Sequence, residues 1–293
     1  MAKILPNSLN LDGVSFPVGI LARDLHFPEG PAFDLYGNLW FVELHGGNLC
    51  CLGKQVSRIS ANGNPNGLTI DYLCRLWICD AGTNSIRIFN QVTRDWQTVI
   101  HRINGEPLAK PNDLAFDNRG NLIFTCPGDS RQEPTGYVGC LLADGSVKKI
   151  AEELYFPNGL IFVNGGKELI VAETYRHRLL RGKWDSTNAK WIDTKPFIVV
   201  CDPVGPGPDG MALGGDGLIY VAVFATGEIK VIDLEGRIHH TYSLPNTNPT
   251  NVAFDPSQKL GLVVTEAKNG LLLNLPKIKQ GAILYDGRDT IKP

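Results

Sequence analysis

The sequence predicts an all-β protein, a six-bladed β-propeller whose four-stranded antiparallel blades surround a central channel. Three observations support this fold class. One motif recurs six times, about four strand-like segments belong to each copy, and no helical hydrophobic periodicity continues for a dozen residues. A two-sheet sandwich would not place the same proline-polar corner at six equivalent positions, so the propeller is the preferred architecture.

The repeated motif is a proline, a polar residue, a small or polar residue, and then two strand-like runs joined by a turn. Its copies are FPEGPAFDLYGNLWFVE, NPNGLTIDYLCRLWICD, KPNDLAFDNRGNLIFTC, FPNGLIFVNGGKELIVAE, GPDGMALGGDGLIYVAV and NPTNVAFDPSQKLGLVVTE. The shared prolines are Pro28, Pro65, Pro111, Pro157, Pro208 and Pro249, which lie 37 to 51 residues apart. Such a period is typical of propeller blades, and turns such as DLYGN and DNRGN are hairpin sequences.

Further strand-like segments complete the blades, among them NSIRIFN, GEIKVIDLEG and, near the C-terminus, GAILYDG. A ring must also satisfy its first and last edges. The strand-like segment from Val14 to Leu25 precedes the first motif, so we expect it to complete the blade formed by the C-terminal residues. The Pro/Gly-rich stretch CDPVGPGPDG is then a loop between blades, and residues 1–293 are predicted to form a single domain.

Composition and charge narrow the class of protein and its partners. The 293 residues are 43% hydrophobic and 20% charged, and the 32 Gly and 19 Pro fit a turn-rich globular chain. The formal net charge of −2 offers no field for nucleic acid or an anionic membrane. No stretch reaches the ~18 apolar residues of a membrane helix, and the N-terminus lacks the apolar core of a secretory signal. We therefore expect a cytoplasmic monomer or small homo-oligomer with no nucleic-acid or membrane partner.

The cysteines and histidines form no recognisable metal or catalytic motif. The seven cysteines are an odd number, without a C-x-x-C pair or histidines at zinc-finger spacing. We interpret them as reduced thiols, several of them in buried strands, rather than as nucleophiles. The six histidines show no ligand spacing, and the G-x-S-x-G motif of serine hydrolases is absent.

The polar residues that follow the six prolines are the candidate site. In a propeller the innermost strand of each blade lines the channel, so these residues are expected to converge on one channel mouth. They are Glu29, Asn66, Asn112, Asn158, Asp209 and Thr250. Asn-Gly and Asp-Gly pairs are also ordinary turn dipeptides, which leaves a purely structural role open for most of these positions.

Glu29 is the exception, because glutamate has no advantage at a tight turn. It shares the predicted mouth with a second carboxylate, Asp209, and two facing carboxylates repel unless a cation lies between them. An all-oxygen set of Glu, Asp and Asn suits a hard cation better than zinc, which usually binds His or Cys. One divalent cation is therefore predicted, with Ca²⁺ as the first choice and Zn²⁺, Mg²⁺, Mn²⁺ or Fe²⁺ as alternatives.

The ordered motifs FPEGPAF, PND, FPNG and PDGMA resemble those of the senescence-marker-protein/gluconolactonase/luciferin-regenerating-enzyme family. The resemblance extends from about Ile20 to Tyr285. It implies a six-bladed propeller with one divalent metal in the channel. Members of that family hydrolyse sugar lactones, and related propellers hydrolyse organophosphates, so the resemblance implies a lactonase whose partner is a small-molecule lactone.

The same resemblance implies a ligand set. Glu29, Asn158 and Asp209 are similar to the family's metal-binding residues, and Asp209 is also similar to its proposed general base. Asn112 resembles an asparagine that contacts the metal or the substrate, depending on the family member. The resemblance therefore makes Asn112 either a fourth ligand or a substrate contact.

Substrate contacts are implied more loosely. Lys110 stands where some members have a substrate-contacting arginine, and lysine cannot form the bidentate fork of arginine. Asp129 or Ser130, in the segment CPGDSRQEPTGY, falls near another substrate-contacting position. Substrate preference is therefore expected to differ from the family's, and a solvated surface lysine stays the alternative for Lys110.

Together these residues predict a hydrolase that opens small, sugar-type lactones with a metal-activated water. Asp209 would take the proton of that water, while Asn66, Asn112 and Lys110 would hydrogen-bond the substrate. Three alternatives stay open, because fold does not determine chemistry. They are a phosphotriesterase-like hydrolase on the same metal, a metal-dependent lyase for which no histidine base is evident, and a non-catalytic propeller that binds a protein partner.

Overall fold

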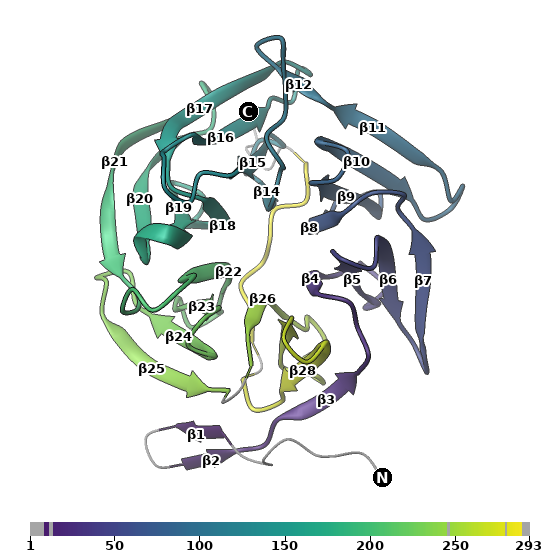
Figure 1. Cartoon of the computed structure of the whole chain (residues 1–293), viewed down its shortest axis with the longest axis vertical. Coiled ribbons are helices and arrows are strands. Elements are labelled where there is room, and N and C mark those ends of the chain that lie inside the picture. The colour runs from purple at the N-terminus through teal and green to yellow at the C-terminus, as the bar shows by residue number, and fades with distance from the viewer. Residues whose placement is uncertain (1–8, 12–13, 245–246, 279, 289–293) are drawn as a thin grey trace.

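The computed structural model contains six four-stranded antiparallel sheets around a central channel, which confirms the predicted six-bladed β-propeller (Figure 1). The structure describes residues 9–11, 14–244, 247–278 and 280–288. Within them the one helical element is the 3₁₀ turn Thr174–Arg176. No helix in this part of the chain is long and apolar enough to cross a membrane.

The strands of each blade follow one another from the channel outward. Blade 1 contains β4 (Pro28–Phe33), β5 (Leu39–Glu43), β6 (Asn48–Leu52) and β7 (Val56–Ser60); blade 2 contains β8 (Pro65–Ile70), β9 (Arg75–Asp80), β10 (Ser85–Asn90) and β11 (Trp96–Ile100); blade 3 contains β14 (Leu114–Phe116), β15 (Leu122–Cys126), β16 (Gly136–Leu141) and β17 (Val147–Leu154). Blade 4 contains β18 (Pro157–Val163), β19 (Glu168–Glu173), β20 (Arg178–Asp185) and β21 (Lys190–Val199); blade 5 contains β22 (Pro208–Leu213), β23 (Ile219–Val223), β24 (Glu228–Ile232) and β25 (Ile238–Ser243). A short hairpin of β12 (Arg102–Ile103) and β13 (Glu106–Pro107) lies between blades 2 and 3 in the chain.

The N-terminal segment closes the ring, as predicted. Blade 6 contains β26 (Pro249–Phe254), β27 (Leu262–Glu266), β28 (Leu271–Leu275) and, at its outer edge, β3 (Gly19–Ala22). Only this part of the predicted Val14–Leu25 segment joins the blade, because β2 (Val14–Phe16) pairs with β1 (Leu9–Leu11) instead.

The prediction of a blade strand at GAILYDG is wrong. Since β3 already occupies the outer edge of blade 6, residues 281–287 form no blade strand, and Gly281 makes only an isolated bridge to Gly214. The C-terminal segment instead crosses the ring, as the yellow trace in Figure 1 shows. On the way, the carbonyl of Gln280 accepts a bond from Gly215 N at 2.9 Å and that of Asp286 accepts one from Tyr72 N at 3.0 Å.

Aspartates form the hairpin turns that end the innermost strands. Asp34 Oδ1 accepts hydrogen bonds from the backbone N–H groups of Tyr36 and Asn38, at 3.0 and 2.9 Å. Asp34 Oδ2 accepts a third bond from Trp40 Nε1 at 3.0 Å, which ties the turn to the next strand. Asp71 repeats these contacts in blade 2. The predicted turns thus lie at one end of the innermost strands and the proline corners at the other.

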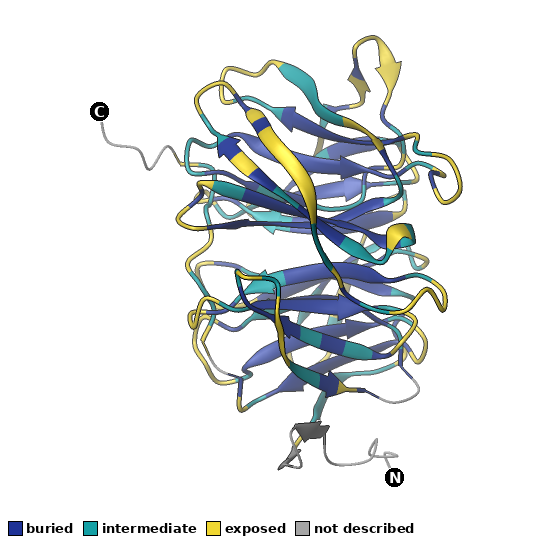
Figure 2. Cartoon of the chain, turned by 90° about the vertical axis from the view of Figure 1, so that its left-hand side faces the viewer, coloured by how far each residue is buried: buried dark blue, intermediate teal, exposed yellow. Residues whose placement is uncertain are grey.

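The hydrophobic core is divided into six clusters that lie between neighbouring blades. Blades 1 and 2, for example, pack through Val42, Leu49, Leu68 and Ile78, and five equivalent clusters follow around the ring. Figure 2 shows this buried interior, with exposed residues on turns and outer strands. Because apolar side chains pack between the sheets, the channel is left to the polar residues of the innermost strands.

The seven cysteines are all free, and Cys50, Cys79, Cys126 and Cys140 are buried. Burial raises the pKa of each of these four thiols. A nucleophilic cysteine needs the opposite shift, so these residues are packing groups of the strands.

Candidate active site

The six corner residues surround one end of the channel. Five of the corner prolines open an innermost strand, and Pro111 lies just before β14. Neighbouring corners are bonded directly to one another: Thr250 Oγ1 donates to the carbonyl of Pro28 at 2.8 Å, and Gly67 N donates to the carbonyl of Asn112 at 2.6 Å. These bonds hold adjacent corners together at this end of the channel.

Two carboxylates, Glu29 on β4 and Asp209 on β22, are buried there with relative exposures of 5% and 8%. Burial raises the pKa of both carboxyls well above the ordinary values; the charge of Asp209 raises that of Glu29 further, and the charge of Asp113 raises both. Among the described residues no lysine or arginine forms an ion pair with Glu29 or Asp209. Buried acids without a protein cation are the arrangement that a bound metal ion stabilises.

Thr174 orients the predicted ligand Asn158, which lies on β18 and is 5% exposed. The Thr174 hydroxyl donates its proton to the carbonyl of Pro208 at 2.8 Å, so Oγ1 accepts the 3.2 Å bond from Asn158 Nδ2. The amide nitrogen is therefore engaged and the Oδ1 atom of Asn158 is left to serve as a ligand. Sequence reasoning missed Thr174; the only sequence signal is its position directly after β19 of the same blade.

The chemistry of this donor set fits a hard divalent cation. Glu29, Asn158 and Asp209 contribute carboxylate and amide oxygens, which Ca²⁺ and Mg²⁺ prefer. In the described ranges no group of three or more His, Cys, Asp or Glu side chains could hold a metal ion, so an amide oxygen is needed to complete the set. The backbone of Asn112 is held at its corner, since its N–H donates to Thr125 O at 2.9 Å and its carbonyl accepts from Gly67 N; its side-chain amide is the candidate fourth donor.

The predicted substrate residues Lys110 and Asp129 pair with each other. Lys110 Nζ donates to Asp129 Oδ1 at 2.7 Å, with side-chain exposures of 50% and 80%, and the bond from Lys110 lowers the pKa of Asp129. Ser130, the other residue considered in this segment, is fully buried and fixes its loop by donating to Pro127 O at 2.6 Å and accepting from Phe156 N at 2.8 Å. Asn66, the fourth predicted substrate residue, is 8% exposed on β8.

Bulky residues just before three corner prolines adopt left-handed backbone conformations. The φ angles are +60° at Phe27, +57° at Phe156 and +48° at Lys110. Such angles are rare for large side chains and concentrate at functional sites. The ring of Phe27 lies 4.6 Å from that of His45 and 6.2 Å from that of Phe224, which gives the polar corners aromatic neighbours that sequence reasoning missed.

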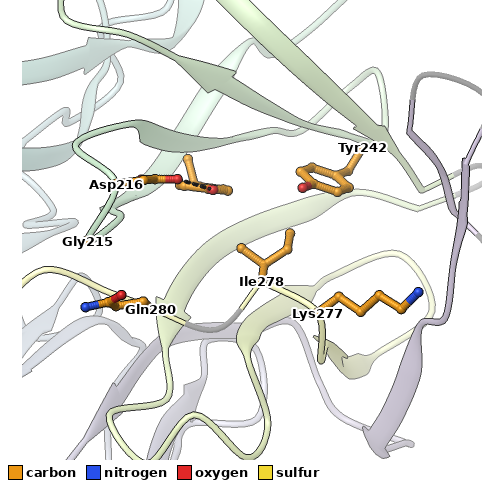
Figure 3. A pocket seen from close by; sticks show the side chains of 7 residues that line it. Gly215, Asp216, Tyr242, Lys277, Ile278 and Gln280 are labelled. Atoms are coloured by element: carbon orange, nitrogen blue, oxygen red, sulfur yellow. Dashed lines mark hydrogen bonds between the residues drawn. The ribbon is translucent and has the colours of Figure 1, made fainter.

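A separate surface pocket of about 340 Å³ lies beside blade 5 and the C-terminal segment (Figure 3). Its lining residues are Gly215, Asp216, Tyr220, Tyr242, Lys277, Ile278 and Gln280. The hydroxyl of Tyr220 donates to Asp216 Oδ2 at 3.0 Å, so part of its polar surface is already paired. None of the predicted site residues lines this pocket, and the channel mouth stays the candidate active site.

Comparison with known proteins agrees with the fold and the ordered motifs. The family model described as "SMP-30/Gluconolactonase/LRE-like region" matches residues 27–268. Diisopropyl-fluorophosphatase of Loligo vulgaris is 25% identical over 312 residues, which cover 90% of this chain and 93% of the relative. Gluconolactonase of Zymomonas mobilis is 26% identical over 205 residues, or 60% of this chain and 58% of the relative. The solved structure of the calcium-binding protein regucalcin from Agrobacterium tumefaciens has a TM-score of 0.80 at 20% identity and covers 93% of this chain and 98% of its own.

Proposed function

The chain belongs to the SMP-30/gluconolactonase/LRE-like family, and from that premise we propose that it is a metal-dependent lactonase that opens small, sugar-type lactones. The observation that carries the proposal is the pair of buried carboxylates, Glu29 and Asp209, with which no lysine or arginine of the described residues forms an ion pair. The relative named gluconolactonase supports lactone hydrolysis as the reaction. The regucalcin neighbour, described as calcium-binding, supports Ca²⁺ as the cation.

Glu29, Asn158 and Asp209 would hold one divalent cation, with Asn112 as a fourth ligand or one water away. When bound, the cation supplies Lewis-acid polarisation of the lactone carbonyl and makes a neighbouring water more acidic. Binding also removes the mutual repulsion of the two carboxylates, which is the physical reason for the site to take up the ion.

The chain's own residues supply the proton transfer and the orientation of substrate. Asp209 accepts the proton of the attacking water, and a carboxylate kept away from lysine and arginine is free to do so. Asn66 and Asn112 present amide groups that hydrogen-bond lactone hydroxyls or the developing oxyanion. Lys110 and Asp129 offer one cation and one anion to the hydroxyls of an entering substrate.

A phosphotriesterase-like activity on the same site is the second candidate. The relative named diisopropyl-fluorophosphatase is matched over nearly its whole length. The aromatic pair Phe27 and Phe224 next to the polar corners also fits a less polar substrate than a sugar lactone. A non-catalytic binding module would not need an unpaired Glu29 and Asp209.

A pH-indicator assay distinguishes these functions, because lactone opening releases a proton from the new acid. Five- and six-membered sugar lactones, an aromatic lactone and a phosphotriester are each tested with Ca²⁺, Mg²⁺, Mn²⁺, Zn²⁺ or EDTA. A sugar lactone should be turned over faster than the phosphotriester, and Asp209→Ala should lose that activity while Asp144→Asn, on an exposed turn, keeps it. Turnover of the phosphotriester alone would favour the second candidate, and no turnover despite metal binding would favour the binding module.

Three further properties stay predictions: the cytoplasmic location, the monomeric or small homo-oligomeric state and the organisation of residues 1–293 as one domain. The identity of the physiological lactone is left to the same substrate screen.

A further inference from the structure

Arginines that stack on aromatic rings differ in whether a carboxylate also binds them. Among the described residues, four of these arginines also form an ion pair with an aspartate or a glutamate: Arg75, Arg87, Arg181 and Arg288. Two others, Arg131 and Arg176, are stacked without an ion pair or a side-chain hydrogen bond in the described part of the chain. A stacked guanidinium without a counter-ion has its N–H groups available for an anionic ligand.

Arg131 lies beside the residues that flank the predicted ligand of blade 4. It belongs to the loop between β15 and β16 of blade 3, and its guanidinium carbon is 5.9 Å from the ring centre of Phe156 and 5.7 Å from that of Tyr175. These distances are typical of cation–π contacts. Phe156 stands two residues before Asn158. Tyr175 directly follows Thr174, whose hydroxyl orients the Asn158 amide. The arginine is therefore held at the edge of the candidate active site.

The position of Arg131 is fixed before a ligand arrives. The rings of Phe156 and Tyr175 are 5.3 Å apart at an angle of 68°, so together they form one aromatic surface. Ser130, the preceding residue, is fully buried and accepts the N–H of Phe156 at 2.8 Å, which ties the loop to blade 4. A guanidinium placed in this way loses little freedom on binding and can present its planar edge to a carboxylate or a phosphate.

The acid in the same loop does not occupy this edge. Asp129 Oδ1 accepts its bond from Lys110 Nζ at 2.7 Å, and the described residues contain no ion pair between Asp129 and Arg131. Lys110 and Asp129 thus offset each other's charge, whereas Arg131 keeps its own. The aromatic neighbours of the other corners, Phe27 and Phe224, offer no charge. An anionic group on a substrate would therefore be recognised on the side of blade 4.

We propose that Arg131 is the anion-recognising residue of the candidate active site, and that the preferred lactones carry a carboxylate or a phosphate outside the lactone ring. This inference rests on the proposed lactonase function and names its substrate class. An arginine fork binds either anion through two parallel N–H···O bonds. The neutral part of the substrate is left to the asparagines and the metal site described above.

The test compares lactones that differ in charge. The five-membered lactones of gluconic and glucaric acid share one carbon skeleton, and a carboxylate in the second replaces the terminal hydroxymethyl group of the first. Phosphorylated gluconolactone supplies a phosphate at the same end. The quantity measured is the ratio of kcat/KM for each anionic lactone to that for the neutral one. The anionic lactone with the higher ratio in the wild type identifies which anion the site prefers.

Arg131→Gln should lower this ratio about tenfold, mainly through KM, because hydrogen bonds to a charged group are lost at an exposed position. Arg131→Lys keeps the charge but not the fork, so its ratio should fall by a smaller factor. Added NaCl should lower the wild-type ratio, since exposed charges are screened, and should hardly change that of Arg131→Gln. Arg94→Gln, which removes an exposed arginine from the β10–β11 turn, should keep the wild-type ratio.

An unchanged ratio in Arg131→Gln, with lactones still hydrolysed, would overturn this inference and leave the proposed function intact. An equal loss in Arg176→Gln would also overturn it, because general surface charge rather than the Arg131 fork would then be responsible. If the wild type hydrolyses no lactone, the proposed function fails, and calorimetric titration with glucarate and gluconate decides the inference separately. Tighter binding of glucarate that Arg131→Gln removes would support the anion site, and equal affinities would overturn it.

Discussion

Two sets of acidic side chains, which have only blade 1 in common, differ in their partners. The second-strand carboxylates are the last residues of β5, β9, β19 and β27, namely Glu43, Asp80, Glu173 and Glu266. Each accepts a backbone N–H from the residues leading into the innermost strand of its own blade, at 2.8 to 3.2 Å. Three of them also form ion pairs, with Arg58, Arg87 and Arg178. They fasten the proline corners to the sheets.

The channel carboxylates, Glu29, Asp113 and Asp209, have amides, backbone groups and one another as neighbours. The pKa values show the difference, because burial acts to raise the pKa of both Glu43 and Glu29. Hydrogen bonds from Arg58 and Asn48 nevertheless bring the pKa of Glu43 below its ordinary value. The pKa of Glu29 stays well above its ordinary value. Similar burial thus has opposite consequences. A paired acid stabilises the fold, whereas an unpaired one leaves the fold with a charge that a cation can neutralise.

The largest expected effect comes from removing one of the second-strand carboxylates. Asp80→Ala removes the partner of Arg87, whose side chain is only 12% exposed, and three backbone N–H bonds besides. The free energy of unfolding should fall by about 3–5 kcal/mol, because one buried charge is left alone. Urea unfolding measures this, and the loss should be the same with Ca²⁺ and with EDTA. Lys183→Ala, in an exposed ion pair, should change stability by less than about 0.5 kcal/mol.

The next largest effect on stability is expected at the channel carboxylates. Ca²⁺ at a hundredfold excess over its dissociation constant should stabilise the wild type by about 2.7 kcal/mol, because the ion binds only the folded state. The melting temperature should therefore drop in EDTA, and Asp209→Ala should melt identically with and without Ca²⁺. A wild type that melts at one temperature in both buffers, with no metal found by elemental analysis, would contradict the predicted site.

A smaller effect is the pH dependence of Glu43. Because its folded-state pKa lies below the ordinary 4.5, its charged form stabilises the fold above that pH, and the contribution disappears as the pH falls through the folded-state pKa. Glu43→Gln should therefore be less stable than the wild type by about 2 kcal/mol at pH 7. The two proteins should converge as the pH falls below about 4. A constant difference across this range would show that shape rather than charge is responsible.

The smallest effect on stability is expected at Lys110. Lys110→Met breaks the exposed pair with Asp129 and should change the free energy of unfolding by less than about 0.5 kcal/mol. The preference among lactones, measured as kcat/KM ratios, should nevertheless change if Lys110 contacts substrate. Unaltered ratios over the whole lactone panel would assign Lys110 to the solvated surface.

The sequence was sufficient for the architecture because each blade repeats one local pattern. The corner prolines and Asp-containing turns are short-range features, and Asp34 and Asp71 form them within five or six residues. Closure by the N-terminus was also predictable, since an open ring edge needs a partner. The strand expected at residues 281–287 failed because two segments competed for that edge, and pattern alone does not say which of them binds there.

The candidate site could be proposed from the sequence in part, and its roles stay predictions. Glu29 drew attention because it is a poor turn residue, and in the structure it is buried and the charge of Asp209 raises its pKa. Asp113 and Thr174 could not be found in this way. Asp113 stands one position beyond the repeated polar residue and resembles ordinary turn chemistry. Thr174 acts through hydrogen bonds to Asn158 of its own blade and to Pro208 of the next blade, which no sequence pattern shows.

The closure of blade 6 also has a consequence for synthesis of the chain. Ala22 of β3 pairs with Leu272 of β28, so the first partner leaves the ribosome long before the second exists. At about 5–20 residues per second the wait is roughly ten to fifty seconds. During that interval the growing ring carries unpaired strand edges, which can pair with another unfinished chain. Crowded translation of this protein should therefore favour strand exchange between copies, and slower initiation should favour the closed monomeric ring.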